Sequence, residues 1–159
     1  YAMHCLLYMV HIPSGKSVGV KELAKYQGVS ETYLSKIFTK LRKSGITKST
    51  PGVKGGYELA RPAENISFWD IVEAIEGTAP LFQCAEIRQN EILLDKNNLP
   101  DTHTKCPCLI KVVMLEAEEQ MKNYLRNKTL RWLRDELNGK IPEEHAKATI
   151  EWFNNPESR

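Results

Sequence analysis

The segment from Gly28 to Gly56, GVSETYLSKIFTKLRKSGITKSTPGVKGG, constrains the fold more than any other part of the chain. A tight turn at 28–30 is followed by a basic, amphipathic stretch at 31–43 and then by a short strand that runs into a glycine-rich turn at 51–56. Glycine and proline at such a turn favour a hairpin. Turn, helix and hairpin in this order are typical of a winged helix-turn-helix.

A short helix before the turn completes the motif. The stretch from Val20 to Tyr26 has apolar residues at 20, 23 and 24, and Gly28 stands where a helix C-cap is expected. Ser30 is a typical N-cap for the next helix. Val29 lies between them, where it can pack inward.

The helix predicted over 31–43 has one apolar face and one polar face. Leu34, Ile37, Phe38 and Leu41 recur at helical spacing and predict the buried side. On the other side, short hydroxyl side chains can approach base edges and lysines can reach phosphates. We therefore expect this helix to contact DNA through Ser30, Thr32, Tyr33, Ser35, Lys36, Thr39, Lys40 and Lys43, with Lys48, Lys54, Gly55 and Gly56 contributed by the hairpin.

The distribution of charge supports this interpretation. The net charge of the 159 residues is only +2, but residues 16–61 carry ten Lys or Arg against three Asp or Glu. That segment therefore has a charge of +7, and the rest of the chain sums to −5. A basic face of this kind favours phosphate binding, whereas the acidic remainder is expected to repel DNA.

The rest of the chain predicts further helices and a long irregular connection. An apolar stretch at 2–11 predicts a buried first helix that includes Cys5, and Ser67 and Gly77 bound a helix at 68–76. Residues 109–125 form a long helix with a single apolar stripe, which needs a partner surface. The predicted fold class is mainly α with a small β wing. The acidic pair at 118–119 is interpreted as a solvated helix face.

Several classes of protein are not supported by the sequence. No apolar run approaches the roughly 20 residues that span a bilayer, and the apolar start lacks a basic leader, so we expect a cytoplasmic protein without a membrane partner. No nucleophile elbow, P-loop or HExxH motif is present, so we do not expect an enzyme. A winged-helix module that binds proteins instead of DNA remains the alternative, although such a module has no need of the clustered lysines.

The residues resemble a known family of regulators. Tyr1-Ala2, the turn and helix GVSETYLSKIFTKLRKSG, the wing PGVKGGYELARPAENIS and the segment IVEAIEG are similar to the Rrf-two family of bacterial transcriptional regulators (IscR-, NsrR- and CymR-like). The resemblance extends from Tyr1 to about Leu137, and the family pattern starts several residues before Tyr1. It implies a repressor-type homodimer whose long helix crosses its symmetry mate. A palindromic operator would then present its half-sites to recognition helices about 34 Å apart.

The same resemblance suggests four regions. These are a winged helix-turn-helix DNA-binding domain at 1–77, a cysteine-bearing, sensor-type loop at 78–108, a dimerisation helix with a following short helix at 109–138, and a C-terminal extension at 139–159. The extension could pack on the body of the protein or add to the dimer.

In the family, three cysteines between the IVEAIEG helix and the dimerisation helix hold an iron-sulfur cluster. The candidates in this chain are Cys84, Cys106 and Cys108, but their spacing departs from the family pattern of about five residues. Here 21 residues separate the first two and one separates the last two. A histidine that serves some relatives as fourth ligand is replaced by Lys111, which leaves His103 as a weak candidate.

Asp101 and Glu86 are further candidates for a fourth ligand. Three interpretations of the cysteines stay open: an iron-sulfur cluster, redox sensing by the thiols, or no ligand role. A zinc site with three thiolates and one histidine is a lesser alternative. A regulator without any cluster would respond to thiol oxidation or to a partner protein.

Overall fold

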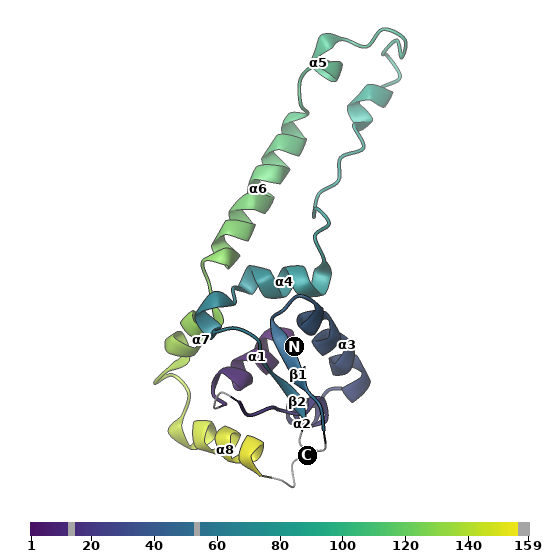
Figure 1. The fold of residues 1–159 in the computed structure, drawn as a ribbon. Helices are drawn as coiled ribbons and strands as arrows, with labels where there is room; N and C mark the ends of the chain where they lie inside the picture. Colours follow the sequence, from purple (N-terminus) through teal and green to yellow (C-terminus); the bar gives the residue numbers. More distant parts are fainter. Residues whose placement is uncertain (13–14, 53–54, 156–159) are drawn as a thin grey trace. The chain divides into compact units, whose positions relative to one another are not determined.

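The computed structural model describes residues 1–12, 15–52 and 55–155 and divides the chain into two compact units. The first unit consists of residues 1–77 together with the chain from Leu125 onward, and the second of Thr78–Tyr124. The elements, labelled in Figure 1, are α1 (Ala2–Val10), α2 (Val20–Gln27), α3 (Glu31–Lys43), β1 (Thr47–Thr50), β2 (Gly56–Leu59), the 3-10 turn η1 (Ala63–Asn65), α4 (Phe68–Glu76), the 3-10 turn η2 (Ile87–Asn90), α5 (Asp101–Thr104), α6 (Leu109–Arg126), α7 (Leu130–Leu137) and α8 (Glu143–Asn154).

The first unit is built around one apolar core to which α1, α2, α3, α4, α7 and α8 all contribute. Leu6 of α1, Leu23 of α2 and Phe38 of α3 are fully buried, and each such side chain stabilises the fold by about 1.5–3 kcal/mol. Cys5 is buried with them, as predicted, and burial raises the pKa of its thiol to about 11. This cysteine is therefore a core residue that stays protonated at neutral pH.

Helices α2 and α3 form the predicted helix-turn-helix. Gly28 ends α2 in the left-handed conformation (φ 65°), and the Val29 N–H donates to the Ala24 carbonyl. The Ser30 hydroxyl accepts from the Tyr33 N–H at 3.4 Å and caps α3, whose bounds are those predicted. Because both caps are local, the sequence alone specifies where the turn lies.

The hairpin pairs β1 and β2 antiparallel, with Thr47 opposite Leu59 and Thr50 opposite Gly56. The pairing continues just before β1, where Ile46 is buried in the core and its carbonyl accepts from the Ala60 N–H. Val18 adds a third strand-like contact, since its N–H and C=O exchange hydrogen bonds with Tyr57. This bridge attaches the hairpin to the segment before α2.

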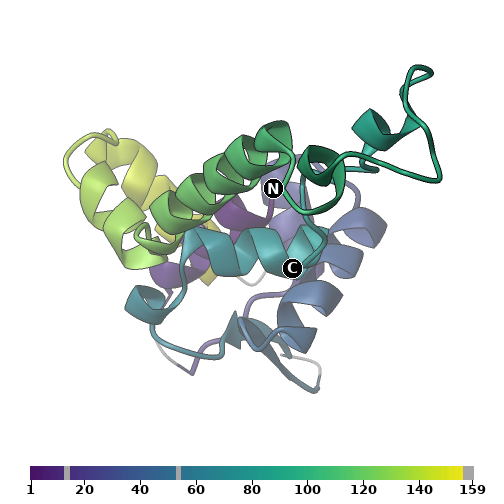
Figure 2. The ribbon, with the colours of Figure 1, turned by 90° about the horizontal axis from the view of Figure 1, so that it is seen from above.

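Helix α4 begins and ends where the sequence predicts. Ser67 and Asp70 form a reciprocal capping box, with distances of 3.0 Å and 2.7 Å between the side chain of each and the backbone N–H of the other. Gly77 ends the helix at φ 91°. Figures 1 and 2 both show α4 lying beside α3, with which it is in contact.

The C-terminal helix α8 packs against α1 and α2 within the first unit, which is one of the two roles that the sequence allows for the extension. Phe153 is only 5% exposed and lies against the rings of Tyr8 and Tyr26 at centroid distances of 5.8 Å and 5.0 Å. The Tyr26 hydroxyl is hydrogen bonded to the Thr149 hydroxyl at 2.8 Å, and the Lys25 ammonium lies 5.3 Å from the Trp152 ring. Helix α8 is therefore anchored to both α1 and α2.

The second unit contains η2, α5 and most of α6. The segment from Thr78 to Cys108, predicted to be mostly irregular, has only the two short helical turns η2 and α5. Among the described residues, no helix combines the length and the hydrophobicity that a bilayer crossing needs.

The anchoring of α8 predicts a specific loss of stability. Replacing Phe153→Ala removes a buried ring and leaves a cavity between α1, α2 and α8, so we expect the free energy of unfolding to fall by about 3 kcal/mol. The exposed neighbour Glu151→Ala should change it by less than about 0.5 kcal/mol. Denaturant unfolding of both variants measures the difference, and equal stabilities would contradict the packing of α8.

Candidate nucleic-acid interface

The polar face of α3 is held outward by the burial of its opposite face. Leu34, Phe38 and Leu41 are fully buried in the core. On the other side Thr32, Lys36, Thr39 and Lys43 are exposed, and Ser35 is half-buried. The Ser30 cap fixes the start of α3 and the buried side chains fix its rotation about its axis. The polar face therefore has a defined orientation.

Not all of the predicted α3 residues are equally available to a ligand. The Lys40 ammonium donates to the Ile75 carbonyl at 2.6 Å, in the last turn of α4. Carbonyls at a helix C-terminus carry partial negative charge, so this contact ties α3 to α4. Within the described part of the chain, Lys36 and Lys43 make no hydrogen bond or ion pair. The structure thus separates two lysines with uncommitted ammonium groups from one that is engaged in the fold.

Two of the hydroxyl groups on α3 also have partners within the fold. Ser30 caps the helix, and the Thr39 hydroxyl donates to the Ser35 carbonyl at 2.8 Å. Tyr33 lies at one edge of the surface, where its ring meets Tyr1 edge-on at a centroid distance of 5.8 Å. Thr32 is also exposed, and within the described residues its hydroxyl makes no hydrogen bond.

The wing residues have structural roles that the sequence did not reveal. Lys48 forms an ion pair with its cross-strand partner Glu58 at 3.3 Å, so its charge is partly compensated. A Cβ at Gly55 would overlap the Thr50 carbonyl oxygen, and one at Gly56 would overlap that of Val18. Gly55 is therefore required by the turn of the hairpin, and Gly56 by the close approach of the segment before α2. Lys54, also predicted to contact DNA, lies outside the described residues.

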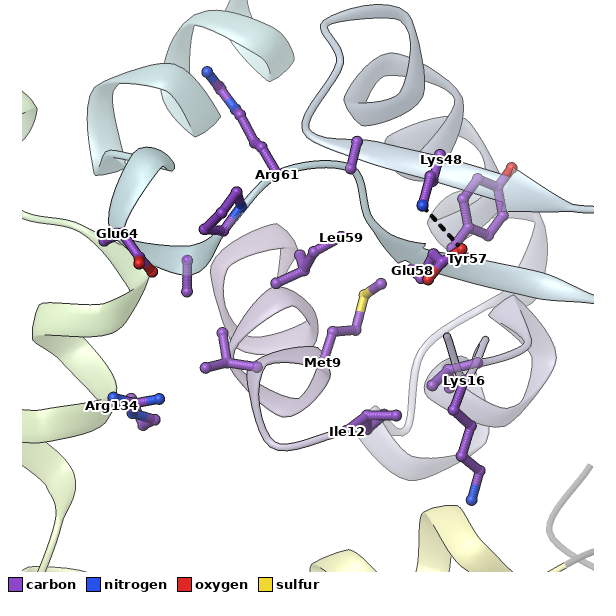
Figure 3. A pocket seen from close by; sticks show the side chains of 15 residues that line it. Met9, Ile12, Lys16, Lys48, Tyr57, Glu58, Leu59, Arg61, Glu64 and Arg134 are labelled. Carbon is purple, nitrogen blue, oxygen red and sulfur yellow. Dashed lines mark ion pairs between the residues drawn. The ribbon is translucent and has the colours of Figure 1, made fainter. Parts of the chain in front are cut away.

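A cavity of about 470 Å³ lies at the base of the hairpin (Figure 3). Its lining includes Lys48, Arg61 and Arg134. Each of these three cations is paired with a carboxylate, and the carboxylates are those of Glu58, Asp70 and Asp135, respectively. A fourth cation of the lining, Lys16, donates instead to the neutral side chain of Asn154. Because most of the positive charge is compensated, we assign no anion to the cavity.

In the second unit, Arg88 organises the segment that carries the three candidate cysteines. Its guanidinium donates to the carbonyls of Thr102 and Cys106, at 2.9 Å and 2.5 Å, and pairs with Glu86 at 3.0 Å. The Gln89 side chain adds a bond to the His103 carbonyl at 2.7 Å. The two ends of the segment are thus held together by side-chain bonds to backbone carbonyls.

The thiols of Cys84, Cys106 and Cys108 are free in this arrangement. Cys84 accepts a hydrogen bond from the Glu86 N–H at 3.4 Å, and Cys106 is exposed. Within the described chain, no three His, Cys, Asp or Glu side chains are grouped so that they could hold a metal ion. The donor set as placed, His103 included, therefore does not fit an iron-sulfur cluster or a zinc ion.

Glu118 was interpreted from the sequence as solvated, and this interpretation was wrong. Its side chain is 5% exposed, because the carboxylate accepts from the Leu81 N–H at 3.2 Å and pairs with Lys122 at 2.6 Å. The hydrogen bond and charge of Lys122, with backbone bonds from Leu81 and Phe82, outweigh desolvation and lower the pKa of Glu118. The carboxylate attaches the chain after Thr78 to α6, while Glu119 is exposed as predicted.

Comparison with known proteins identifies the family. The Rrf2 family model, described as an iron-dependent transcriptional regulator, matches residues 1–136. Protein rrf2 of Nitratidesulfovibrio vulgaris is 34% identical over 130 residues, which cover 82% of this chain and 79% of that protein. The chain belongs to the Rrf2 family of transcriptional regulators. The regulator IscR of Cereibacter sphaeroides is 41% identical over 80 residues, or 49% of this chain and 52% of IscR.

Solved structures of regulators named IscR and CymR have the same fold. IscR from T. potens is 24% identical, with a TM-score of 0.63 over 90% of this chain and 88% of that one. CymR from Staphylococcus aureus is 25% identical, with a TM-score of 0.59 over 84% and 92%. The predicted fold class, a mainly α protein with a small β wing, is confirmed. As an Rrf2 protein the chain is a DNA-binding transcriptional regulator and not an enzyme.

The role of Glu118 gives a prediction with a definite pH dependence. The pKa of Glu118 is lowered in the fold, so its stabilising contribution is present above the ordinary pKa of glutamate and is lost as the pH falls through the folded value. We expect Glu118→Gln to reduce protection of the Leu81 amide against hydrogen exchange, and exposed Glu116→Gln to leave it unchanged. Unaltered protection in Glu118→Gln would show that the carboxylate does not hold this segment.

Proposed function

We propose that this Rrf2 regulator binds a palindromic operator as a homodimer, with α3 in the major groove and the wing against the flanking groove or backbone. The observation that carries the proposal is the exposed polar face of α3, on which Lys36 and Lys43 have no partner in the described chain. An ammonium group that is not engaged in the fold can bind a phosphate without first breaking an intramolecular bond. Thr32 lies on the same exposed face and has a hydroxyl suited to a base edge.

The charge of the segment supports the same surface. Residues 16–61 carry a net charge of +7, whereas the remainder of the chain sums to −5. Such a distribution attracts a polyanion to the helix-turn-helix and hairpin rather than to the rest of the chain. We infer that the regulator acts in the cytoplasm, where it meets bacterial DNA, and that it represses by occupying its operator.

The homodimer is supported by the apolar stripe of α6. Val113 and Tyr124 are 61% and 65% exposed, and Ile110, Ala117 and Met121 lie on the same side by helical periodicity. Exposed apolar side chains in a continuous row are typical of an interaction surface. A second copy of α6 offers the same stripe, so an isologous contact would cover both. The two-fold axis would then impose its symmetry on the operator.

We propose that the segment 78–108 reports the signal through its thiols and not through a cluster. Free Cys84, Cys106 and Cys108, the last two on either side of Pro107, support this proposal, as does the lack of a grouped set of metal ligands in the described chain. Arg88 and Gln89 hold backbone carbonyls of the same segment, so oxidation of a thiol there can disturb a defined network.

The α3 surface gives a prediction that distinguishes two neighbouring lysines. Lys36→Ala should weaken operator binding and reduce the slope of log K against log salt by about one, because one phosphate contact is lost. Lys40→Ala should instead lower the free energy of unfolding by about 0.3–1 kcal/mol, through loss of the bond to Ile75, and change the slope little. Fluorescence anisotropy across a salt series measures both slopes.

The two variants test different parts of the proposal. Equal slopes for wild type and Lys36→Ala would overturn the placement of α3. A loss of slope in Lys40→Ala as large as that in Lys36→Ala would show that the bond to Ile75 opens on DNA.

The α6 stripe gives a second prediction. Val113→Asp places a charge in the stripe, near its N-terminal end, and should convert the dimer into a monomer with weaker operator binding, since burial of an unpaired carboxylate is costly. Glu119→Lys, on another face of α6, should remain dimeric. Sedimentation equilibrium gives the mass, and a dimeric Val113→Asp protein would contradict this interface.

The cysteines are tested by anaerobic purification followed by visible absorption and by iron and sulfide analysis. We expect a colourless protein with substoichiometric iron whose operator affinity falls after treatment with hydrogen peroxide. Replacing Cys84, Cys106 and Cys108 by Ser should remove that response, whereas Cys5 is buried and is left in place. Stoichiometric iron and sulfide would establish a cluster instead.

A further inference from the structure

Helix α8 lines a second cavity, partly open to solvent, on the side of the first unit where α1 and α7 lie. The family model ends at residue 136, so α8 is an addition to the matched part of the chain. The cavity measures about 430 Å³, and its apolar lining includes Leu7, Leu137, Ala146 and Ile150. This volume is within the roughly 300–1,000 Å³ typical of sites for small organic molecules.

A few polar groups converge on the apolar lining. His11, His145 and Thr149 line the cavity, together with Arg134 and Asp135. Desolvation, with the nearby charge of Arg134, lowers the pKa of His11, so its imidazole is neutral at neutral pH. Arg134 and Asp135 are paired at 2.7 Å and cancel in charge. The His11 and His145 imidazoles can hydrogen bond to a ligand, but the lining does not favour a ligand with a net charge. The Thr149 hydroxyl is already engaged, because it is bonded to the Tyr26 hydroxyl and donates to the His145 carbonyl.

Two residues of the lining also touch the first helix of the helix-turn-helix. Thr149 is hydrogen bonded to Tyr26 of α2 at 2.8 Å, and the ring of Tyr8 meets that of Tyr26 at a centroid distance of 4.9 Å. A ligand that displaces Thr149 or Tyr8 therefore changes the packing of Tyr26. Since α2 is joined to α3 by the tight turn at Gly28, the cavity has a short physical connection to the DNA-binding surface.

We propose that the cavity between α1, α7 and α8 is an effector site for a small, neutral, mostly apolar ring compound that carries one hydrogen-bonding group. The compound fills the space between Leu7 and Ile150 and bonds to the polar cluster at His11. Binding of the compound changes the position of α2 through Tyr26. The resulting effect on operator affinity rests on the proposed function, whereas binding of the compound itself does not.

Indole is a suitable probe, because it is a neutral bicyclic ring with a single N–H. Titration of the full chain with indole, followed by protein NMR without DNA, should shift the amide resonances of Leu7, Ala146 and Thr149. In Ala146→Trp the new side chain occupies the cavity, so indole affinity should fall at least about tenfold. Ala148→Trp places the same side chain on α8 away from the lining and should bind indole as the wild type does.

Ile141→Trp fills the cavity from the chain between α7 and α8 and provides a second variant should Ala146→Trp fail to fold. The proposal is overturned if indole shifts none of the lining residues, if it shifts only the exposed stripe of α6, or if both cavity-filling variants bind it with unchanged affinity.

The connection to α2 is tested with Thr149→Val, which removes the hydroxyl but keeps the shape of the side chain. This variant should bind indole within about threefold of wild type, while the effect of indole on operator affinity should be lost. Because indole binding is measured without DNA, failure of the site and failure of the proposed DNA surface give different results. An unchanged effect of indole in Thr149→Val would overturn the path through Tyr26.

Discussion

The structure depends above all on the burial of one face of α3. Leu34, Phe38 and Leu41 are fully buried, and the core around them includes residues from α1, α2 and α4. Burial on this scale stabilises the unit by several kcal/mol, whereas an exposed ion pair contributes about 0–1 kcal/mol. The polar face of α3 is exposed as a consequence. The surface that we assign to DNA is therefore held in place by packing, and its own side chains are left to bind a ligand.

Residues of the same type in the helix-turn-helix and hairpin make different contacts within the protein. Lys40 bonds to the end of α4, whereas Lys36, four residues earlier, has no partner in the described part of the chain. Gly55 and Gly56 allow close approach between segments of the protein's own backbone. Fewer residues are therefore available to DNA than the motif contains polar residues and glycines. The available surface centres on Thr32, Lys36 and Lys43.

Local signals explain why much of the fold was predictable. Ser30 and Ser67 are caps whose partners lie three residues away, and Gly28 adopts the conformation that its position demands, so the bounds of α3 and α4 followed from neighbouring residues. The bridge from Val18 to Tyr57, the bond from Lys40 to Ile75 and the carboxylate of Glu118 join residues far apart in sequence. A helical period shows which face a residue occupies, but it does not show what that face meets. The DNA contacts and the roles of the cysteines likewise depend on what those residues meet outside the chain, so they stay predictions.

Cleavage of DNA from a reagent tethered to α3 tests the central claim most directly. An iron chelate attached through Thr39→Cys, on the exposed face of α3, with the chelate-treated wild type as blank, is bound to DNA that the unmodified protein selects from a random pool. The account predicts two clusters of cuts in symmetric half-sites, about 34 Å or a multiple of it apart along the duplex. Uniform cleavage, or the pattern of the blank, would show that α3 does not face the DNA.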